Sequence, residues 1–532
     1  MRSVLIIGSG PAAAGAALAL LKDPEISITI VDLGLRLEKG NEEARDRLAS
    51  GDESSWSAED LETVQHQPVS VSEGRLPQKR TFGSDYPFRD LGQQVGLSTP
   101  GGTTPPVVSA AFGGFSNVWG AQTMPFSRAT FDTWPISLEE LEPHYAVALA
   151  EMNVSGEDDA LGTLFPHIIP PEPLPPVSER TQVVLDAFEK DRDRVESLGI
   201  TVGHARLALR SSGCTRCGLC MTGCPHQLIY SSSQTFDRLI ASGRVTYRSG
   251  LLVTSVAEDD LGPLVRAKNL HDGTVETIRA DRVFLGCGGL GTTRLVLGSL
   301  GTPAPPLDLL ESVQFLLPAA SVRPVTDLRG ARDFTLNQFN MVYDDTGTGL
   351  DLVQVHFYPN NPAMEREFPQ IVQHSAFRTL RTAVLGRLSV GLGYLPSWAS
   401  PKITVRARSV GADALPELDL ERRDSTLWPP MLRRFVSAMA KAAPALDLWP
   451  VAPMISVSKA TKSYHFGGTF PLSDAPRGLE TDRLGRLERW NRIHLIDAST
   501  FPSVPATTFT LTIMANAHRI ATESMHLERS ER

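Results

Sequence analysis

The sequence has few cysteines, no excess of positive charge and no long apolar run. Its 532 residues include only five cysteines, four of them within residues 214–224, unlike the even spread of a secreted, disulfide-stabilised protein. The net charge of −9 argues against a nucleic-acid partner held by a basic surface. No apolar run has the ~20 residues of a membrane span. The nearest candidate, residues 380–395, carries Arg381 and Arg387, so we expect a buried segment there rather than a membrane-surface patch.

The other bulk properties are those of an ordinary globular protein. Hydrophobic residues make up 41% and charged residues 21% of the chain, and its length predicts two or more domains around a sizeable core. The N-terminus enters an apolar strand without a secretory signal, so we expect a cytoplasmic, reducing location, with peripheral membrane association left open. In that setting the clustered cysteines favour a metal or cluster site over disulfides.

Residues 4–32 predict a strand–helix–strand unit with a dinucleotide-binding fingerprint. Gly8 permits a tight turn after the first strand. Gly10 lets the backbone approach a pyrophosphate, whose charge lies at the N-terminus of the following helix. Asp32 follows the second strand and is placed to accept a hydrogen bond from a ribose hydroxyl. The pattern predicts a dinucleotide site but does not distinguish NAD from FAD.

Four further helices are expected along the chain. Ser137 and Glu140 have the spacing of a capping box, which predicts a helix ending near Met152. The other helices are predicted over residues 179–198, 233–242 and 511–525.

Strand patterns divide the rest of the chain. Residues 245–279 predict a strand-rich hairpin, and 282–300 a second strand–turn–helix that returns to the first sheet. Segments after residue 307 alternate apolar and polar residues, which indicates antiparallel strands with one solvated face. A strand at 493–498 is expected to rejoin the first sheet.

The expected fold class is therefore α/β, or α+β overall, with a Rossmann-like dinucleotide-binding domain and an antiparallel-sheet substrate domain. The first domain is expected to span residues 1–306, with a cysteine-rich insertion at 211–226. The substrate domain is expected at 307–460, and residues 461–532 complete the first domain.

The cysteine run reads CTRCGLCMTGCP, with Cys214, Cys217, Cys220 and Cys224 followed by Pro225. This C-x2-C-x2-C-x3-C-P spacing is that of bacterial ferredoxins, and it favours an iron–sulfur cluster of the 3Fe–4S or 4Fe–4S type. Zinc is an alternative, although four-cysteine zinc sites usually have two CxxC pairs separated by a longer loop. A loop without metal is the other alternative.

Several separated segments together resemble the GMC family, the glucose–methanol–choline flavoprotein oxidoreductases. The similarity is strongest to the bacterial sugar and alcohol dehydrogenase branch, which shares SNVWG and a WPI segment like residues 134–136. The matching segments are GSGP at 8–11, GGFSNVWG at 113–120, GCGGLG at 286–291, HFGGTF at 465–470 and LIDAS at 495–499.

This resemblance implies FAD rather than NAD as the cofactor. It implies that the ADP half of FAD is bound by Gly8, Gly10, Pro11, Ala12 and Asp32, and that the flavin lies along Gly114, Ser116, Asn117 and Val118. It also implies that Val253 contacts adenine, and that Asp497 and Ala498 lie by the pyrophosphate and ribityl end.

The resemblance also implies catalytic residues. His465 in H-x-G-G-T matches the base that takes the hydroxyl proton of an alcohol, and a histidine pKa suits this task near neutrality. The family has a second polar residue, His or Asn, where this chain has Thr508. A threonine hydroxyl can donate a hydrogen bond to the substrate oxygen but is not an effective base. The replacement leaves a single-base mechanism on His465 or a changed reaction.

Taken together, these features predict an FAD-dependent dehydrogenase that oxidises the CH–OH group of a sugar or other alcohol. Electrons are expected to pass through an iron–sulfur cluster to an external acceptor, either a protein such as a cytochrome or ferredoxin or a quinone. Three alternatives remain. The first is an oxygen-using alcohol oxidase without a cluster, and the second is a flavin-dependent isomerase or epimerase with no net oxidation. The third is an electron-transfer subunit with a non-catalytic flavin.

Overall fold

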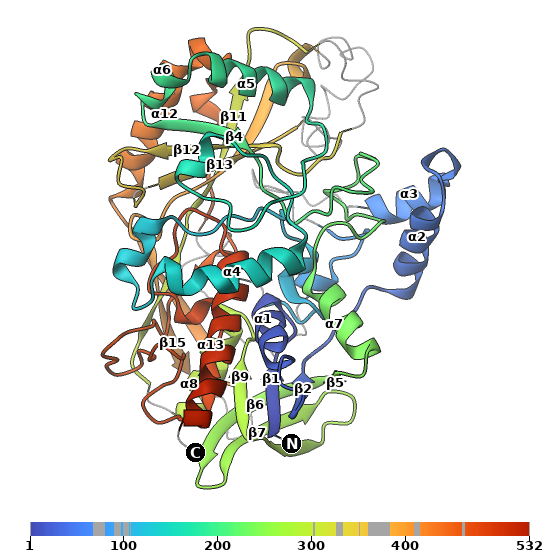
Figure 1. The fold of residues 1–532 in the computed structure, drawn as a ribbon, viewed down its shortest axis with the longest axis vertical. Helices are drawn as coiled ribbons and strands as arrows, with labels where there is room; N and C mark the ends of the chain where they lie inside the picture. Colours follow the sequence, from blue (N-terminus) through green and yellow to red (C-terminus); the bar gives the residue numbers. More distant parts are fainter. Residues whose placement is uncertain are drawn as a thin grey trace.

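The computed structural model places a parallel sheet with both chain termini at one end of the molecule and a large antiparallel sheet at the other (Figure 1). Helix α4 crosses between them. The residues that the structure describes are 2–66, 80–89, 97–98, 106, 108–301, 304–325, 333–350, 352–359, 383–408, 415–459 and 463–530.

The parallel sheet collects strands from distant parts of the chain. Its order is β20-β9-β1-β2-β5, and every neighbouring pair is parallel. The expected strand–helix–strand unit, the second strand–turn–helix and the returning C-terminal strand are thereby confirmed. The strands are β1 (Arg2–Ile7), β2 (Ile26–Val31), β5 (Val245–Arg248), β9 (Arg282–Leu285) and β20 (Ile493–Leu495).

Three helices pack over one face of this sheet. Helix α1 (Pro11–Leu20) is rich in alanine, and its small side chains let α13 (Thr510–Ser530) approach closely. A Cβ atom on Gly15 would lie 2.1 Å from the carbonyl oxygen of Met514. Helix α4 (Leu138–Met152) packs on α13 and begins with the predicted capping box. The C-terminal helix is therefore joined to the N-terminal fingerprint by backbone contact.

The antiparallel sheet has the order β17-β11-β14-β13-β12-β4, with β18 pairing β11. Its apolar face forms a core with helices α5 (Glu179–Lys190) and α12 (Trp428–Leu446). The strands are β4 (Ile200–His204), β11 (Gln314–Ala320), β12 (Phe339–Asp344), β13 (Leu352–Tyr358), β14 (Leu388–Tyr394), β17 (Trp449–Pro450) and β18 (Ser456–Val457).

The other face of this sheet is buried along β12 and β13, so the expectation of a solvated face is wrong for residues 352–358. It is confirmed for β15 (Lys402–Arg408) of another sheet, where Lys402, Arg406 and Arg408 are exposed. Gln354 and His356 alternate with apolar residues along β13, yet they are only 0% and 2% exposed. Alternation shows which residues share a face of a strand, but not whether water or protein covers that face. Here the polar face is covered by protein.

Two smaller sheets complete the strands. One has the order β19-β10-β15-β16-β3 and the other is the meander β6-β7-β8. Their strands are β3 (Leu97–Ser98), β10 (Leu307–Glu311), β15 (Lys402–Arg408), β16 (Glu417–Arg423), β19 (Phe466–Gly467), β6 (Leu251–Asp259), β7 (Gly262–Asn269) and β8 (Val275–Arg279).

Some predicted elements differ from the observed ones. The helix expected over 179–198 is two helices, α5 (Glu179–Lys190) and α6 (Arg192–Glu196), because Asp191 leaves helical geometry at φ −116° and ψ 27°. The hairpin expected over 245–279 gives its first strand, β5, to the parallel sheet. The remaining helices are α2 (Lys39–Ser50), α3 (Ala58–Gln65), α7 (Ser232–Ala241) and α8 (Gly289–Leu300).

Within the described ranges, no helix is long and apolar enough to cross a membrane. The apolar candidate at 380–395 begins with residues outside the described ranges, and its later part forms β14 inside the antiparallel sheet. The domain division at residues 306 and 460 stays a prediction. Strand β4 lies before the first boundary and pairs with β12 beyond it.

We predict that Gly15→Ala weakens the packing of α1 on α13. The added methyl group overlaps the Met514 carbonyl, which belongs to a helix backbone and has no room to shift. Overpacking of this kind costs about 1–3 kcal/mol of unfolding free energy. Denaturant unfolding measures the loss, and Gly40→Ala, where the new methyl meets nothing within 4 Å, is the control. Equal stability of both variants would contradict the contact.

Candidate functional site

The four parallel strands β1, β2, β9 and β20 end at one edge of their sheet. The residues that follow them are Gly8, Asp32, Gly286 and, one residue later, Asp497. Gly8 has φ +102°, and a Cβ atom there would lie 2.4 Å from the Gly286 carbonyl oxygen, so the two glycine turns touch. Ligands of open α/β sheets bind at this edge, outside the carboxyl ends of the strands.

The first glycine turn has the features of an anion site. A Cβ atom on Gly10 would meet nothing within 4 Å, and helix α1 begins there without a side-chain cap or an acidic residue in its first turn. Its first backbone N–H groups are therefore available to a negatively charged group. Pro11 and Ala12 lie in this first turn, with Ala12 buried. The turn fits the pyrophosphate of FAD.

Asp32 is held by its neighbours at the end of β2. Its carboxylate accepts hydrogen bonds from the Ser9 hydroxyl, from the Leu33 N–H at 2.8 Å and from the Tyr247 hydroxyl at 3.4 Å. Burial raises the pKa of Asp32 to about 7. Ser9 also accepts from the N–H of Gly113 at 2.9 Å, so it joins the acid to the middle loop.

The middle loop, η4 (Gly114–Asn117), lies against the glycine turn. A Cβ atom on Gly114 would lie 3.7 Å from Cα of Gly10. The Ser116 hydroxyl donates to the Gly113 carbonyl at 2.6 Å, and Asn117 Nδ2 donates to the Gly114 carbonyl at 2.8 Å. These two side chains stabilise the loop itself. Any contact from them or from Val118 to a flavin stays a prediction.

The C-terminal segment connects this edge to His465. Asp497 accepts from the Thr292 hydroxyl at 2.5 Å and from the Ser499 N–H at 2.9 Å, and burial raises its pKa. The carbonyl of Ala498 accepts from the N–H of Gly468 at 2.9 Å. The H-x-G-G-T loop therefore touches the segment expected to hold the cofactor. Val253 is buried on β6, whose first residue, Leu251, donates its N–H to the carbonyl of Asp32 at 3.1 Å. Its contact to adenine stays a prediction.

His465 lies in an aromatic environment between the sheets. Its ring stacks on Tyr394, with centroids 4.5 Å apart, and packs at 4.8 Å against Phe509. Its Nδ1 atom is buried without a hydrogen-bond partner. Burial lowers the pKa of His465 to about 3, so the imidazole is neutral at physiological pH.

Sequence reasoning missed a second imidazole, His356 on β13. Its ring lies 5.4 Å from that of Tyr394, and its Nε2 atom is also buried without a partner. Burial, with a smaller contribution from His465, lowers the pKa of His356 to about 3. The available signal was a polar residue at every second position of an otherwise apolar strand.

Thr508 precedes Phe509, whose ring packs against that of His465. Its hydroxyl donates to the backbone carbonyl of Gln122 at 2.9 Å. A threonine hydroxyl has one proton to donate, so in this arrangement it can only accept a hydrogen bond from a substrate.

The cysteine loop places Cys220 in a buried position and the other three thiols in half-buried ones. Cys220 Sγ accepts from the N–H of a threonine in another segment at 3.4 Å. Burial raises the pKa of Cys217 to about 11 and of Cys224 to about 12.

The four thiols are free and share one loop, but they do not converge on a point. In the part of the chain that the structure describes, no three Cys, His, Asp or Glu side chains have the arrangement of a metal site. Four cysteine thiols are the donors that an iron–sulfur cluster requires, but in this structure they are not arranged around a common centre.

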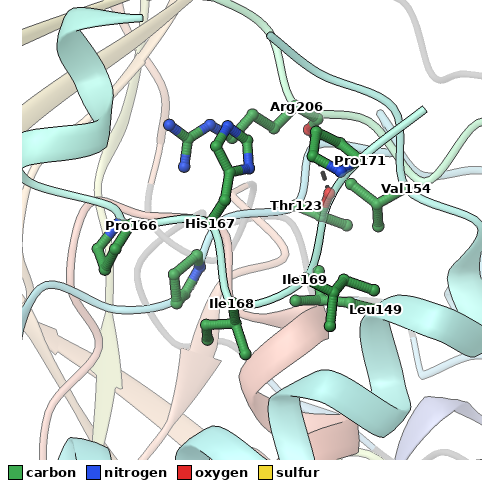
Figure 2. Close-up of a pocket in the computed structure, with 10 residues that line it drawn as sticks. Thr123, Leu149, Val154, Pro166, His167, Ile168, Ile169, Pro171 and Arg206 are labelled. Carbon is green, nitrogen blue, oxygen red and sulfur yellow. Dashed lines mark hydrogen bonds between the residues drawn. The ribbon is translucent and has the colours of Figure 1, made fainter. Parts of the chain in front are cut away.

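Two cavities lie near these elements. One, of about 100 Å³, is lined by Cys220 and Cys224 on one side and by Ser116 and Asn117 on the other, so it separates the cysteine loop from the middle loop. The other, of about 10 Å³, is lined by proline and isoleucine side chains with Thr123, His167 and Arg206 (Figure 2). The second cavity has room for a single water molecule and not for a substrate.

We predict that Gly10→Ala reduces FAD binding without unfolding the protein. Gly10 has φ −73°, which alanine adopts freely, and the methyl group meets no protein atom within 4 Å. It does occupy the space beside the helix N-terminus, so the purified variant should contain less FAD per chain by its visible absorbance. The thermal midpoint of the flavin-free protein should not change. Full FAD content in this variant would contradict the assigned cradle.

Comparisons with solved structures agree with the fold. The chain matches pyridoxine 4-oxidase from Mesorbium loti with a TM-score of 0.60 and 15% identity, covering 99% of each chain. It matches formate oxidase from Aspergillus oryzae RIB40, in a structure concerned with FAD modification, with a TM-score of 0.63 and 13% identity, covering 100% of this chain and 99% of that one. No family model and no curated protein matches the sequence significantly. The expected fold class is confirmed: the chain has the mixed α/β fold of these two oxidases.

Proposed function

We propose that this protein is an FAD-dependent oxidoreductase acting on the CH–OH group of a small molecule. The observation that carries the proposal is the neutral, half-buried His465, whose loop is bonded through Gly468 to Ala498 at the cofactor edge. The fold shared with two oxidases, one of them described with FAD, supports it. When bound, FAD supplies a hydride acceptor.

The proposed role of His465 follows from its environment. Oxidation of an alcohol to a carbonyl removes the hydroxyl proton to a base and the carbon-bound hydrogen, with its electron pair, to the cofactor. A neutral imidazole with an unpartnered nitrogen can take that proton. The Tyr394 stack limits rotation of the ring, and Phe509 packs against it. His465 must release the proton before the next turnover.

The proposed mechanism has a single base. Thr508 donates its only proton to the Gln122 carbonyl, so it does not supply the second hydrogen-bond donor that the resembled family places there. The single proton of the reacting hydroxyl goes to His465, so the Thr508 oxygen can accept only from another donor group of the substrate. The polar, buried face of the antiparallel sheet supports a substrate-binding role for residues 307–460.

The identity of the electron acceptor distinguishes two candidate functions, an oxidase and a dehydrogenase. The names of both structural neighbours favour oxygen as the acceptor, in an oxidase. The cysteine loop favours a dehydrogenase, because its ferredoxin spacing suits an iron–sulfur cluster that would pass electrons to a protein or quinone. We propose the dehydrogenase, and the iron content decides between the two.

We predict that His465→Asn lowers kcat/KM for an alcohol by about 10²–10⁴-fold, the contribution of a general base. FAD content should not change. In the wild type the lowered pKa keeps His465 unprotonated in mild acid. The pH at which kcat/KM falls on the acid side should therefore lie well below 6.5, the ordinary pKa of histidine. The exposed His271→Asn is the control. Unchanged turnover in His465→Asn, or an acid limb near 6.5, would contradict the assignment.

We predict that protein purified without air contains iron and acid-labile sulfide in the ratio of a 3Fe–4S or 4Fe–4S cluster. Cys217→Ser and Cys220→Ser should lose the iron, and Cys287→Ser, which lies outside the loop, should retain it. Iron assay with electron paramagnetic resonance measures both. FAD-loaded protein that lacks iron and forms one hydrogen peroxide per alcohol oxidised would establish the oxidase instead.

A further inference from the structure

The buried face of the antiparallel sheet carries a row of amide and imidazole groups beside the proposed catalytic base. Gln354 and His356 share one face of β13. In the strand register Gln354 is opposite Tyr394 of β14, and His356 is opposite Asn340 of β12. The three groups Gln354, His356 and Asn340 are 0%, 2% and 0% exposed.

Several polar atoms in this region have no partner. They are Nε2 of Gln122, Oδ1 of Asn337, Oε1 of Gln354 and Nε2 of His356. Each of these side chains is at most 2% exposed. A buried polar group without a hydrogen bond destabilises the fold, and native structures contain few of them. Four such groups in one region indicate a ligand that completes their hydrogen bonds.

Contacts connect this group to His465 along the sheet. Tyr394 stacks on His465 at 4.5 Å, and His356 lies 5.4 Å from the Tyr394 ring. Asn340, opposite His356, accepts a hydrogen bond from Asn337 Nδ2 at 3.2 Å.

A second path returns to the same histidine. Asn337 Nδ2 also donates to Gln122 Oε1 at 2.7 Å. The Gln122 carbonyl accepts from Thr508, and Phe509 packs on His465 at 4.8 Å. Gln122, Asn337 and His356 therefore belong to one ring of neighbouring residues that includes His465. Gln354 adjoins this ring, because it is opposite Tyr394 and its Nε2 atom donates to Met124 Sδ at 3.3 Å.

The chemistry of these atoms selects the ligand. Gln122 presents an N–H donor, whereas Asn337 and Gln354 present carbonyl acceptors. The orientation of the first two amides follows from their shared hydrogen bond. The four groups include no ionised side chain, and an anion would be repelled by the two carbonyl oxygens. A hydroxyl group both donates and accepts, so it satisfies such a mixed set.

We propose that Gln122, Asn337, Gln354 and His356 form a subsite for the additional hydroxyl groups of a polyhydroxylated substrate. The inference rests on the proposed function, in which His465 deprotonates the reacting hydroxyl. The subsite binds the hydroxyls that flank it. A substrate with a single hydroxyl leaves these polar groups unpaired and binds less well.

The test compares two alcohols on the FAD-loaded full-length protein. The ratio of kcat/KM for xylitol to that for 1-propanol should favour xylitol. Gln354→Met should reduce this ratio by about tenfold or more, because it removes an acceptor built to bond a substrate hydroxyl. The protein without turnover gives a second readout, since xylitol should raise the thermal midpoint more in the wild type than in Gln354→Met.

A matched variant separates binding from structure. Gln338 is also fully buried, but its amide is satisfied by Ser178, Thr181 and Phe334. Gln338→Met should lower the thermal midpoint and leave the alcohol ratio unchanged. Gln354→Met should keep or raise the midpoint of the ligand-free protein, because it removes an unpartnered oxygen.

The outcomes are distinguishable. A wild-type ratio that does not favour xylitol, or an unchanged ratio in Gln354→Met with a lowered midpoint, would overturn the subsite and leave the amides to the fold or to ordered water. Failure to oxidise either alcohol, with FAD bound, would overturn the proposed function. In that case the thermal shift with xylitol still decides the subsite: a shift lost in Gln354→Met supports it, and no shift in the wild type refutes it.

Discussion

The backbone contact between the H-x-G-G-T loop and Ala498 is the constraint on which the rest of the site depends. A Cβ atom on Gly467 would lie 2.2 Å from the Ala498 carbonyl oxygen, and the Gly468 N–H bonds that same oxygen. Gly467 also pairs with β10 of a neighbouring sheet. The loop is thereby held between the parallel sheet and the antiparallel strands, and His465 is placed where the two meet.

Desolvation gives this site its chemistry. Burial disfavours the charged form of an imidazole, so His465 and His356 are both neutral and both have a nitrogen without a partner. A neutral imidazole is the form that accepts a proton. The same exclusion of water makes the unpaired amides nearby unfavourable until a ligand fills the site, which is the usual relation between function and stability at active sites.

The cysteine loop shows how local and tertiary structure contribute to one feature. Its C-x2-C-x2-C-x3-C spacing is local and brings four thiols into one loop. The hydrogen bond to Cys220 Sγ comes instead from the N–H of Thr335, more than a hundred residues away in the chain. The cavity between this loop and the middle loop exists only because α7 and the glycine turn hold the middle loop in place.

Local patterns in the sequence determined the first strand–helix–strand unit, its glycine turn, the capping box before α4 and the strand–turn–helix at β9, because each depends on residues close together in the chain. They also singled out His465 and the cysteine run. Only the tertiary structure decided that the polar face of β13 is buried, that His356 and Tyr394 meet His465, and that Thr508 gives its proton to Gln122. Those contacts join residues of separate elements, up to 386 positions apart for Thr508 and Gln122, and no periodicity encodes which element will cover a given face.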